Sequence, residues 1–257
     1  MVRLGQNFLA DPNLLDAIVR DAELAPGDVV LEVGAGEGVL TERLAAAAAH
    51  VHSVEIDRGL EPALAGLMSQ ANVDLHWGDA MKVDLSALTP APTAMVANLP
   101  YSVATPLLLR TIDELPALGR WTVMVQREIA DRLRAAPGNR TYGSPSVLVQ
   151  LACEVELVRK VDPAVFKPRP RVDSAILALR RTGPAADQPT RELVRAGFAH
   201  RRKSLARSLE HSRPGSLEAA RGALVELGFA ADARAEALGA EDFANLSARL
   251  QAAQADA

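Results

Sequence analysis

Apolar residues in the first two thirds of the chain form short runs rich in Val, Ile and Leu, separated by amphipathic stretches. Such runs, bounded by turn residues, predict buried β-strands. We expect strands at residues 29–33, 50–57, 73–77, 93–97, 121–126, 147–158 and 174–179. Helices are expected from residue 12 to the Pro26-Gly27 pair, at 39–49 and at 59–69. Strands alternating with helices predict an α/β fold with a mainly parallel sheet covered on both faces.

The pattern changes after Arg181. Residues 182–189 (TGPAADQP) are rich in turn-forming residues and have the composition of a linker. Beyond them no strand pattern appears, and helical periodicity predicts helices at 190–211, 216–228, 232–238 and 241–253. We therefore expect two domains, residues 1–184 and residues 185–257, of which the second is small and all-helical.

Composition bounds the class of protein. Hydrophobic residues make up 49% and charged residues 23% of the chain, which is ordinary for a soluble domain. The longest apolar run, residues 44–49, is far shorter than the roughly 20 residues of a membrane span. The N-terminus turns polar too early for a secretory signal, and the single cysteine, Cys153, excludes an internal disulfide. We expect a cytoplasmic protein with no membrane partner, and assume a monomer.

Charge is distributed unevenly along the chain. The net charge is −4, but residues 1–119 hold 6 Lys/Arg against 16 Asp/Glu, whereas residues 120–184 hold 12 against 6. Residues 191–213 hold 7 basic and 2 acidic residues. This asymmetry favours contact between the second half and a polyanion such as nucleic acid. The plainer interpretation is that these arginines solvate helix faces.

A glycine cluster follows the first predicted strand. Gly34, Gly36 and Gly38 allow a sharp turn and a close approach of backbone to ligand, and the helix behind them offers free N–H groups. Glu55 ends the second strand, where an acid can accept ribose hydroxyls. Asp79 follows the third strand, where a carboxylate can accept from an adenine amine. Together they predict a nucleotide-type cofactor site, although each acid alone is as well explained as a loop cap.

The tetrapeptide Asn98-Leu99-Pro100-Tyr101 follows the fourth strand. An exocyclic adenine nitrogen is a poor nucleophile because its lone pair delocalises into the ring. The Asn98 side-chain oxygen and the Leu99 carbonyl could accept its two protons, Pro100 stiffens the loop, and Tyr101 offers a face for a flipped base. This favours methyl transfer to adenine by positioning and electrostatics. The structural alternative is an ordinary strand-ending turn.

Other chemistries find less support. Methylation of a pyrimidine carbon usually needs a nucleophilic cysteine, but Cys153 lies in an apolar strand pattern that indicates packing. The histidines show no metal-ligand spacing with cysteine or paired acids, His50 and His52 look structural, and we expect no metal. A nicotinamide- or flavin-dependent enzyme would have glycine where Val39 stands.

The combination of motifs resembles the rRNA adenine N6-dimethyltransferases. The matching segments, in order, are Gly5-Gln6-Asn7-Phe8-Leu9, residues 32–38, Val54-Glu55-Ile56-Asp57, Gly78-Asp79-Ala80, residues 98–101, Gln126-Arg127-Glu128, Tyr142-Gly143 and residues 166–174. The resemblance extends from residue 5 to at least residue 209. It implies a Rossmann-like class I methyltransferase fold with a seven-stranded, mostly parallel sheet whose last strand is antiparallel.

The resemblance also assigns a cofactor, S-adenosylmethionine, and residues to hold it. Asn7 and Leu9 would close over its methionine part, above Gly34 in the glycine loop. Glu55 would hold the ribose and Asp79 the adenine amine. The family often has a basic N-terminal extension, of which only Arg3 is present here.

For the substrate, the resemblance implies that Asn98 faces both the cofactor and the target nitrogen, and that Tyr101 and Phe166 sandwich the adenine. From the residues alone, Phe166 is equally well explained as a core residue. Residues 198–209 and 172–175 resemble the branch that dimethylates two adjacent adenosines near the 3′ end of small-subunit rRNA, within a pre-ribosomal small subunit. The phosphate-contact candidates are Arg127, Arg132, Arg134, Arg201, Arg202, Lys203 and Arg207.

Two alternatives remain open within the family. One is the branch that methylates large-subunit rRNA and confers macrolide resistance. The other is an RNA-binding assembly factor that kept the fold without the catalysis. Asn7, Glu55, Asp79 and Asn98 argue against the second without excluding it.

Overall fold

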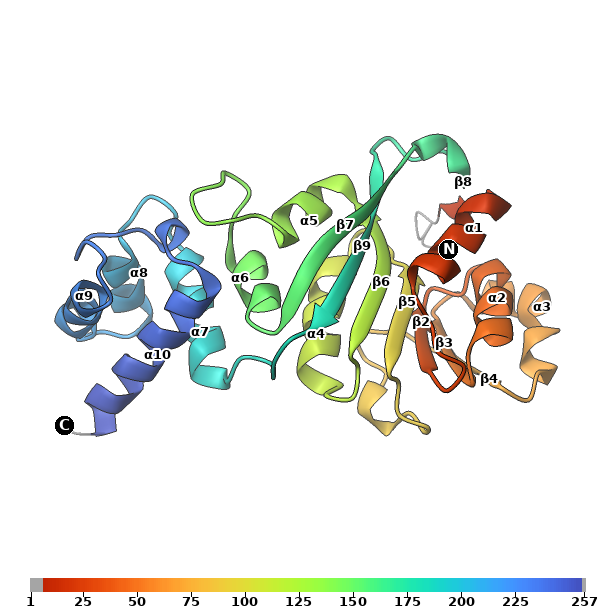
Figure 1. Cartoon of the computed structure of the whole chain (residues 1–257), viewed down its shortest axis with the longest axis horizontal. Helices are drawn as coiled ribbons and strands as arrows, with labels where there is room; N and C mark the ends of the chain where they lie inside the picture. Colours follow the sequence, from red (N-terminus) through yellow and green to blue (C-terminus); the bar gives the residue numbers. More distant parts are fainter. Residues whose placement is uncertain (1–6, 256–257) are drawn as a thin grey trace. The chain divides into compact units, whose positions relative to one another are not determined.

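The computed structural model describes residues 7–255 of the chain (Figure 1). These residues form two compact units. The first comprises residues up to Ala130 together with Val155–Arg181; the second comprises Asp131–Glu154 and residues from Thr182 onward. Among the described residues, no helix is long and apolar enough to cross a membrane.

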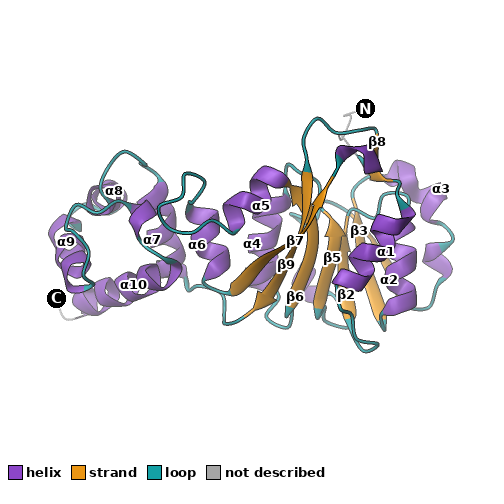
Figure 2. Ribbon diagram, turned by 45° about the horizontal axis from the view of Figure 1, so that its top comes forward, coloured by secondary structure: helices purple, strands orange, loops and turns teal. Residues whose placement is uncertain are grey.

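The first unit is built on a seven-stranded sheet with the spatial order β4-β3-β2-β5-β6-β9-β7 (Figure 2). Its strands are β2 (Val29–Val33), β3 (His50–Glu55), β4 (Val73–Trp77), β5 (Ala94–Asn98), β6 (Arg120–Gln126), β7 (Cys153–Val161) and β9 (Ser174–Arg181). From β4 to β6 neighbouring strands pair in parallel, and β9, the last in the chain, pairs antiparallel to β6. The predicted α/β fold with a mostly parallel seven-stranded sheet is confirmed.

Helices cover both faces of this sheet. They are α1 (Pro12–Asp21), α2 (Val39–Ala47), α3 (Glu61–Leu64), α4 (Ala104–Glu114) and α5 (Arg127–Leu133), the last of which runs into the second unit. Val30 and Met124 share one core cluster with residues of α1, α2 and α3. Trp121, three residues before Met124, faces the other way and its indole N–H donates to Thr111 of α4 at 2.9 Å. The centre of the sheet is therefore buried on both faces, which explains why β2, β5 and β6 are largely apolar.

Two short strands and four 3₁₀ turns complete the first unit. The strands β1 (Phe8–Leu9) and β8 (Phe166–Lys167) pair antiparallel, with Leu9 opposite Phe166. The turns are η1 (Arg58–Leu60), η2 (Leu67–Ser69), η3 (Leu85–Ala87) and η4 (Pro163–Val165). The β1–β8 pair ties the N-terminal motif to a segment more than 150 residues away, and so brings two distant sequence motifs to one place.

The second unit is helical. It contains α6 (Ser144–Gln150), α7 (Gln188–Phe198), α8 (Leu205–Ser212), α9 (Leu217–Glu226), η5 (Ala235–Ala237) and α10 (Ala240–Ala255). Its centre holds a chain of rings, in which Phe198 lies 5.9 Å from Tyr142 and 5.7 Å from Phe243 between centroids. The Tyr142 hydroxyl donates to the Leu238 carbonyl at 2.9 Å, and burial raises the pKa of Tyr142 to about 12. This unit includes residues 131–154, which the expected division at residue 184 assigns to the first domain.

Four predicted elements were wrong in part, one of which is the expected helix 232–238, where the structure has only the 3₁₀ turn η5 (Ala235–Ala237). The expected strand 147–158 begins as helix α6, with Pro145 in its first turn and the Ser146 hydroxyl accepting the Gly143 N–H at 3.1 Å. The expected helix 59–69 is broken into η1, α3 and η2. The expected helix 190–211 is two helices, because α7 ends at Phe198 and α8 begins after Ser204.

Candidate active site

The strand order reverses between β2 and β5, and the carboxyl edge of the sheet at this reversal is called the crevice here. From β2 the chain proceeds through β3 to the edge strand β4, then returns to β5 on the other side of β2. Open α/β sheets bind ligands at such a reversal, outside the carboxyl ends of the strands. Gly34, Glu55, Asp79 and Asn98 all stand at or just after the carboxyl ends of these four strands. The structure thus brings the polar residues predicted from four separate motifs to one edge of the sheet.

The glycine loop between β2 and α2 is closely approached by other backbone and side chains. Gly34 and Gly36 have φ of +86° and +58°, which favours glycine. A Cβ on Gly36 would stand 3.2 Å from a ring carbon of Phe8, and one on Gly34 would stand 3.7 Å from the Asn98 carbonyl oxygen. The loop backbone is therefore packed against Phe8 at Gly36 and lies beside the end of β5 at Gly34.

Glu55 is held in place by the backbone of its neighbours. Its side chain is buried, one carboxylate oxygen accepts the Gly36 N–H at 2.9 Å, and the other accepts the Asp57 N–H at 2.8 Å. Each carboxylate oxygen has a second lone pair available. The carboxylate is thus fixed beside the glycine loop and retains acceptor capacity for a ligand hydroxyl.

Glu32, beneath the glycine loop, is a residue to which sequence reasoning gave no role. One of its oxygens accepts the hydroxyls of Thr41 at 2.6 Å and Ser53 at 2.7 Å; the other is buried without a hydrogen-bond partner. Burial, opposed by these hydroxyls and reinforced by the charge of Glu55, raises the pKa of Glu32 to about 7. The sequence does contain a sign of this buried acid, because Glu32 lies inside an otherwise apolar strand, VVLEV.

Asp79 is half-buried in the turn after β4. Its Oδ1 accepts the Met81 N–H at 2.9 Å. The turn is anchored from α4 by Arg110, whose guanidinium donates to the carbonyls of Ala80 at 2.6 Å and Val83 at 2.9 Å. Arg110 therefore positions this turn, although nothing in its sequence context indicated so.

Asn98 ends β5 facing the N-terminal segment. Its side chain is half-buried, and its Nδ2 donates to the Asn7 carbonyl at 3.5 Å. This orientation leaves the side-chain oxygen as an acceptor. The next residue, Leu99, is anchored to β6 through its N–H, which donates to the Met124 carbonyl at 3.0 Å. Pro100 follows as an exposed residue, so the turn is tied at its start and stiff at its centre.

Tyr101 is half-buried, and its hydroxyl forms a 2.7 Å hydrogen bond with the Ser174 hydroxyl at the start of β9. This bond restricts the ring to one direction. Ser174 was part of a recognised motif, but its bond to Tyr101 was not predicted.

The chain matches the family model described as ribosomal RNA adenine dimethylase over residues 2–252. The chain belongs to this family. The "Ribosomal RNA small subunit methyltransferase A" of Rubrobacter xylanophilus is 46% identical over 252 residues, covering 96% of this chain and 94% of that protein. The protein of the same name from Streptomyces coelicolor is also 46% identical, covering 95% and 88%.

Solved structures of two methyltransferases resemble the whole chain. A dimethyladenosine transferase from Plasmodium falciparum superposes with a TM-score of 0.78 at 26% identity, covering 93% of this chain and 95% of that one. The 23S rRNA methyltransferase ErmE superposes with a TM-score of 0.70 at 30% identity, covering 95% and 100%. The predicted family and methyltransferase class are confirmed.

Within this family fold, two predicted site residues are buried in the core. Leu9 is 7% and Phe166 2% exposed, and both belong to the cluster that contains Ile18 and Ile176. In this arrangement a base reaches the Phe166 ring only if the β1–β8 pair moves. The roles of Leu9 and Phe166 stay predictions. Gly5, Gln6 and Arg3 lie outside the described residues.

The basic candidates divide between the two units. Arg127 belongs to the first unit, and the other six candidates belong to the second. Arg134, Arg202 and Arg207 are exposed. Arg201 donates to the Arg140 carbonyl at 2.9 Å and lies 3.8 Å from Glu236, while Lys203 contacts His211. Residues 201–203 therefore lie on the surface of the helical unit as a basic turn between α7 and α8.

Proposed function

We propose that this chain transfers methyl groups from S-adenosylmethionine to N6 of two adjacent adenosines near the 3′ end of small-subunit rRNA, producing N6-dimethyladenosines. The substrate is the rRNA within a pre-ribosomal small subunit, and the enzyme acts as a cytoplasmic monomer. The names of the two relatives at 46% identity support the small-subunit substrate over the large-subunit one. The observation that carries the chemistry is the position of Asn98 between the glycine loop and Asn7.

The residues at the crevice fit S-adenosylmethionine. The glycine loop brings backbone without side chains beside the end of β5, and Glu55 and Asp79 offer carboxylate oxygens at the ends of successive strands. Glu55 would accept the ribose hydroxyls and Asp79 the adenine amine, while Asn7 and Leu9 would cover the methionine part beside Gly34 and Gly36. When bound, S-adenosylmethionine supplies a methyl group on a positively charged sulfur, open to in-line attack.

The Asn-Leu-Pro-Tyr turn would hold the target base. The Asn98 side-chain oxygen and the Leu99 carbonyl would accept the two protons of the adenine amine and direct its lone pair. Tyr101, restrained by Ser174, would stack on the unstacked base, with Phe166 as the proposed opposite face. A strong base is unnecessary, because the nitrogen loses its proton readily once it bears positive charge. The rate then depends on positioning and on fixed dipoles.

Basic residues would bind the RNA through its phosphates. Arg127, Arg132, Arg134, Arg201, Arg202, Lys203 and Arg207 are the proposed phosphate contacts. We also propose the division into a cofactor-binding domain, residues 1–184, and a helical domain, residues 185–257.

The test uses small ribosomal subunits from a strain that lacks the enzyme. Incubation with the protein and labelled cofactor, followed by a reverse-transcription stop assay, should map methylation to two adjacent adenines. Transfer to large-subunit rRNA instead would favour the macrolide-resistance branch. Cofactor binding without transfer to either would favour a non-catalytic assembly factor and would overturn the proposal.

Asn98→Ala tests the assigned role. It should keep cofactor affinity within about tenfold, or about 1.4 kcal/mol, and should lose most turnover. Asn245→Ala is the matched control, since Asn245 is an exposed asparagine on α10 in the helical unit. Full turnover in Asn98→Ala would remove the assigned role.

Tyr101→Phe and Tyr101→Ala distinguish the contribution of the aromatic ring to turnover from that of the hydroxyl. Phe keeps the stacking face and loses only the bond to Ser174, so turnover should fall a few-fold. Ala removes the face, worth about 1–3 kcal/mol per stacked base, and should lower turnover by at least tenfold. Equal losses in both variants would contradict a stacking role.

A further inference from the structure

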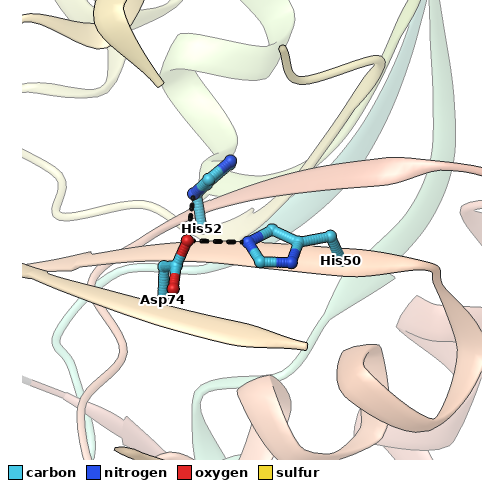
Figure 3. Close-up of side chains that lie close together, drawn as sticks. All are labelled: His50, His52 and Asp74. Atoms are coloured by element: carbon cyan, nitrogen blue, oxygen red, sulfur yellow. Dashed lines mark hydrogen bonds and ion pairs between the residues drawn. The ribbon is translucent and has the colours of Figure 1, made fainter. Parts of the chain in front are cut away.

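Three side chains from two neighbouring strands converge at the amino-terminal end of the sheet. His50 and His52 alternate on β3 and so face the same side, and Asp74 on β4 stands beside His52 in the register. Asp74 Oδ2 lies 2.9 Å from His50 Nε2 and 3.6 Å from His52 Nδ1 (Figure 3). All three atoms lie within 4.8 Å of one another.

These distances suit a metal ion. A tetrahedral ion with bonds of about 2.0–2.1 Å to imidazole nitrogen and carboxylate oxygen separates its ligand atoms by about 3.3 Å. The two measured separations, 2.9 Å and 3.6 Å, fall on either side of that value. Adjustments of a few tenths of an ångström in these two pairs would bring them to it.

The hydrogen bonds of His52 leave the required lone pair on the correct nitrogen. Its Nε2 is 2.8 Å from the Pro90 carbonyl oxygen, which only accepts, so Nε2 carries the proton and Nδ1 the lone pair. In metal sites, a carbonyl that accepts the N–H of a ligand histidine fixes the orientation of its ring. The lone pair of His52 Nδ1 and the oxygen of Asp74 then face each other, an arrangement that a cation stabilises.

A third histidine, His76, lies beside the three proposed ligands, with its ring centroid 5.3 Å from that of His52. His76 Nε2 lies 3.2 Å from His52 Nδ1 and can donate to it when no metal is bound. His76 is only half-buried, and can turn away when an ion enters.

We propose that His50, His52 and Asp74 form a binding site for a divalent transition-metal ion of the zinc class, with solvent completing the coordination. Two imidazole nitrogens favour such ions over Mg²⁺ and Ca²⁺, which prefer oxygen ligands. The ion would tie the edge strand β4 to β3. His50 lies about 16 Å along β3 from Glu55, so the site is separate from the methyl-transfer crevice and independent of the proposed function.

The test measures metal binding by the full chain after removal of metal with a chelator. Titration with Zn²⁺ should show one tight equivalent, Co²⁺ should give the visible absorption of a tetrahedral or five-coordinate site, and the melting temperature should rise with Zn²⁺. Mg²⁺ should produce none of these effects. Asp74→Asn and His50→Gln should each weaken Zn²⁺ binding at least tenfold and remove the zinc-dependent rise in melting temperature.

The matched control is the double variant His200→Gln with His211→Gln. It removes the other two histidines of the chain, whose rings lie 5.0 Å apart in the helical unit, and should leave the tight equivalent unchanged. A purely structural His50–Asp74 ion pair would lower the melting temperature of the variants but would not make it zinc-dependent. Absence of a tight equivalent in the unaltered chain, or its loss in the control, overturns the proposal. If Asp74→Asn does not fold, His50→Gln decides alone.

Discussion

Replacement of Glu32 by glutamine tests how the buried acid under the glycine loop affects stability. In the folded chain Glu32 is 1% exposed and its pKa is raised to about 7, chiefly by burial. Glutamine has the same shape, keeps an oxygen for the hydroxyls of Thr41 and Ser53, and never ionises. The variant therefore removes the cost of charging this site, while the unpartnered NH₂ that it places at the buried Oε1 position has the same cost at every pH.

The sign follows from proton linkage. Between the ordinary pKa of 4.5 and about 7, the folded state binds the Glu32 proton and the unfolded state does not. Stability from this group is therefore fully present below pH 4.5 and is lost as the pH rises toward 7. The difference in pKa corresponds to about 3 kcal/mol in total, of which about 2.5 kcal/mol falls between pH 5 and pH 8.

Urea unfolding at pH 5 and pH 8 measures this effect. Both tryptophans of the chain, Trp77 and Trp121, lie in the first unit with Glu32, so their fluorescence reports its unfolding. From pH 5 to pH 8, Glu32→Gln should lose about 2–3 kcal/mol less stability than the unaltered chain. Glu37→Gln, an exposed acid of the same loop, is the control and should follow the unaltered chain. Equal pH dependence in Glu32→Gln and the unaltered chain would refute the reasoning.

Two further predictions concern the glycine loop and the basic turn. Gly38→Ala forces φ of +84° on alanine and sets its Cβ 2.4 Å from Leu67 Cδ1, so unfolding free energy should fall by about 2–4 kcal/mol. Gly66→Ala, where a Cβ meets nothing within 4 Å, should change it little, and equal effects in urea unfolding would contradict the steric argument. Arg201→Ala with Arg202→Ala should weaken subunit binding and flatten the slope of log affinity against log salt by about 1.5. An unchanged slope between 50 and 200 mM salt would exclude both as phosphate contacts.

The alternation of strands and helices was predictable because its cause is local. The central strands β2 and β5 are buried on both faces and are therefore largely apolar runs. The same rule misled at residues 147–150, where an apolar run is a buried helix instead. Periodicity does not separate a short buried helix from a buried strand. The Ser144-Pro145 pair at its start was the signal that distinguishes them.

The break between α7 and α8 depends on a contact that the sequence does not display. A Cβ on Gly197 would stand 2.6 Å from Leu205 Cδ1, so the two helices pack closely at this glycine. The periodicity of residues 190–211 is compatible with one continuous helix as well as with a helical hairpin. Only the tertiary packing, with Phe198 between Tyr142 and Phe243, favours the hairpin.

The sequence allowed us to predict the site residues that lie at strand ends, because the carboxyl ends of parallel strands lie at one edge of the sheet. The supporting residues were not predictable, because Arg110 and Ser174 act through contacts with segments 27 to 73 residues away. For the same reason, the sequence did not indicate the cluster that we propose as a metal site. His50 and His52 have no sequence neighbour that completes a ligand set, and Asp74 joins them only through the register of β3 with β4.

Backbone hydrogen bonds fix the Glu55 side chain, so this part of the crevice needs little rearrangement when a ligand binds. If the carboxylate were mobile in solvent, part of the ligand's binding free energy would be used to order this side chain. Here the amides of Gly36 and Asp57 already hold both oxygens, and the Gly34 amide donates to the Val54 carbonyl at 2.8 Å. The loop and the acid therefore order each other before any ligand arrives. Reactions that proceed by positioning, without a strong base, depend on such order, because a displacement of a single ångström at the reacting atoms costs about a hundredfold in rate.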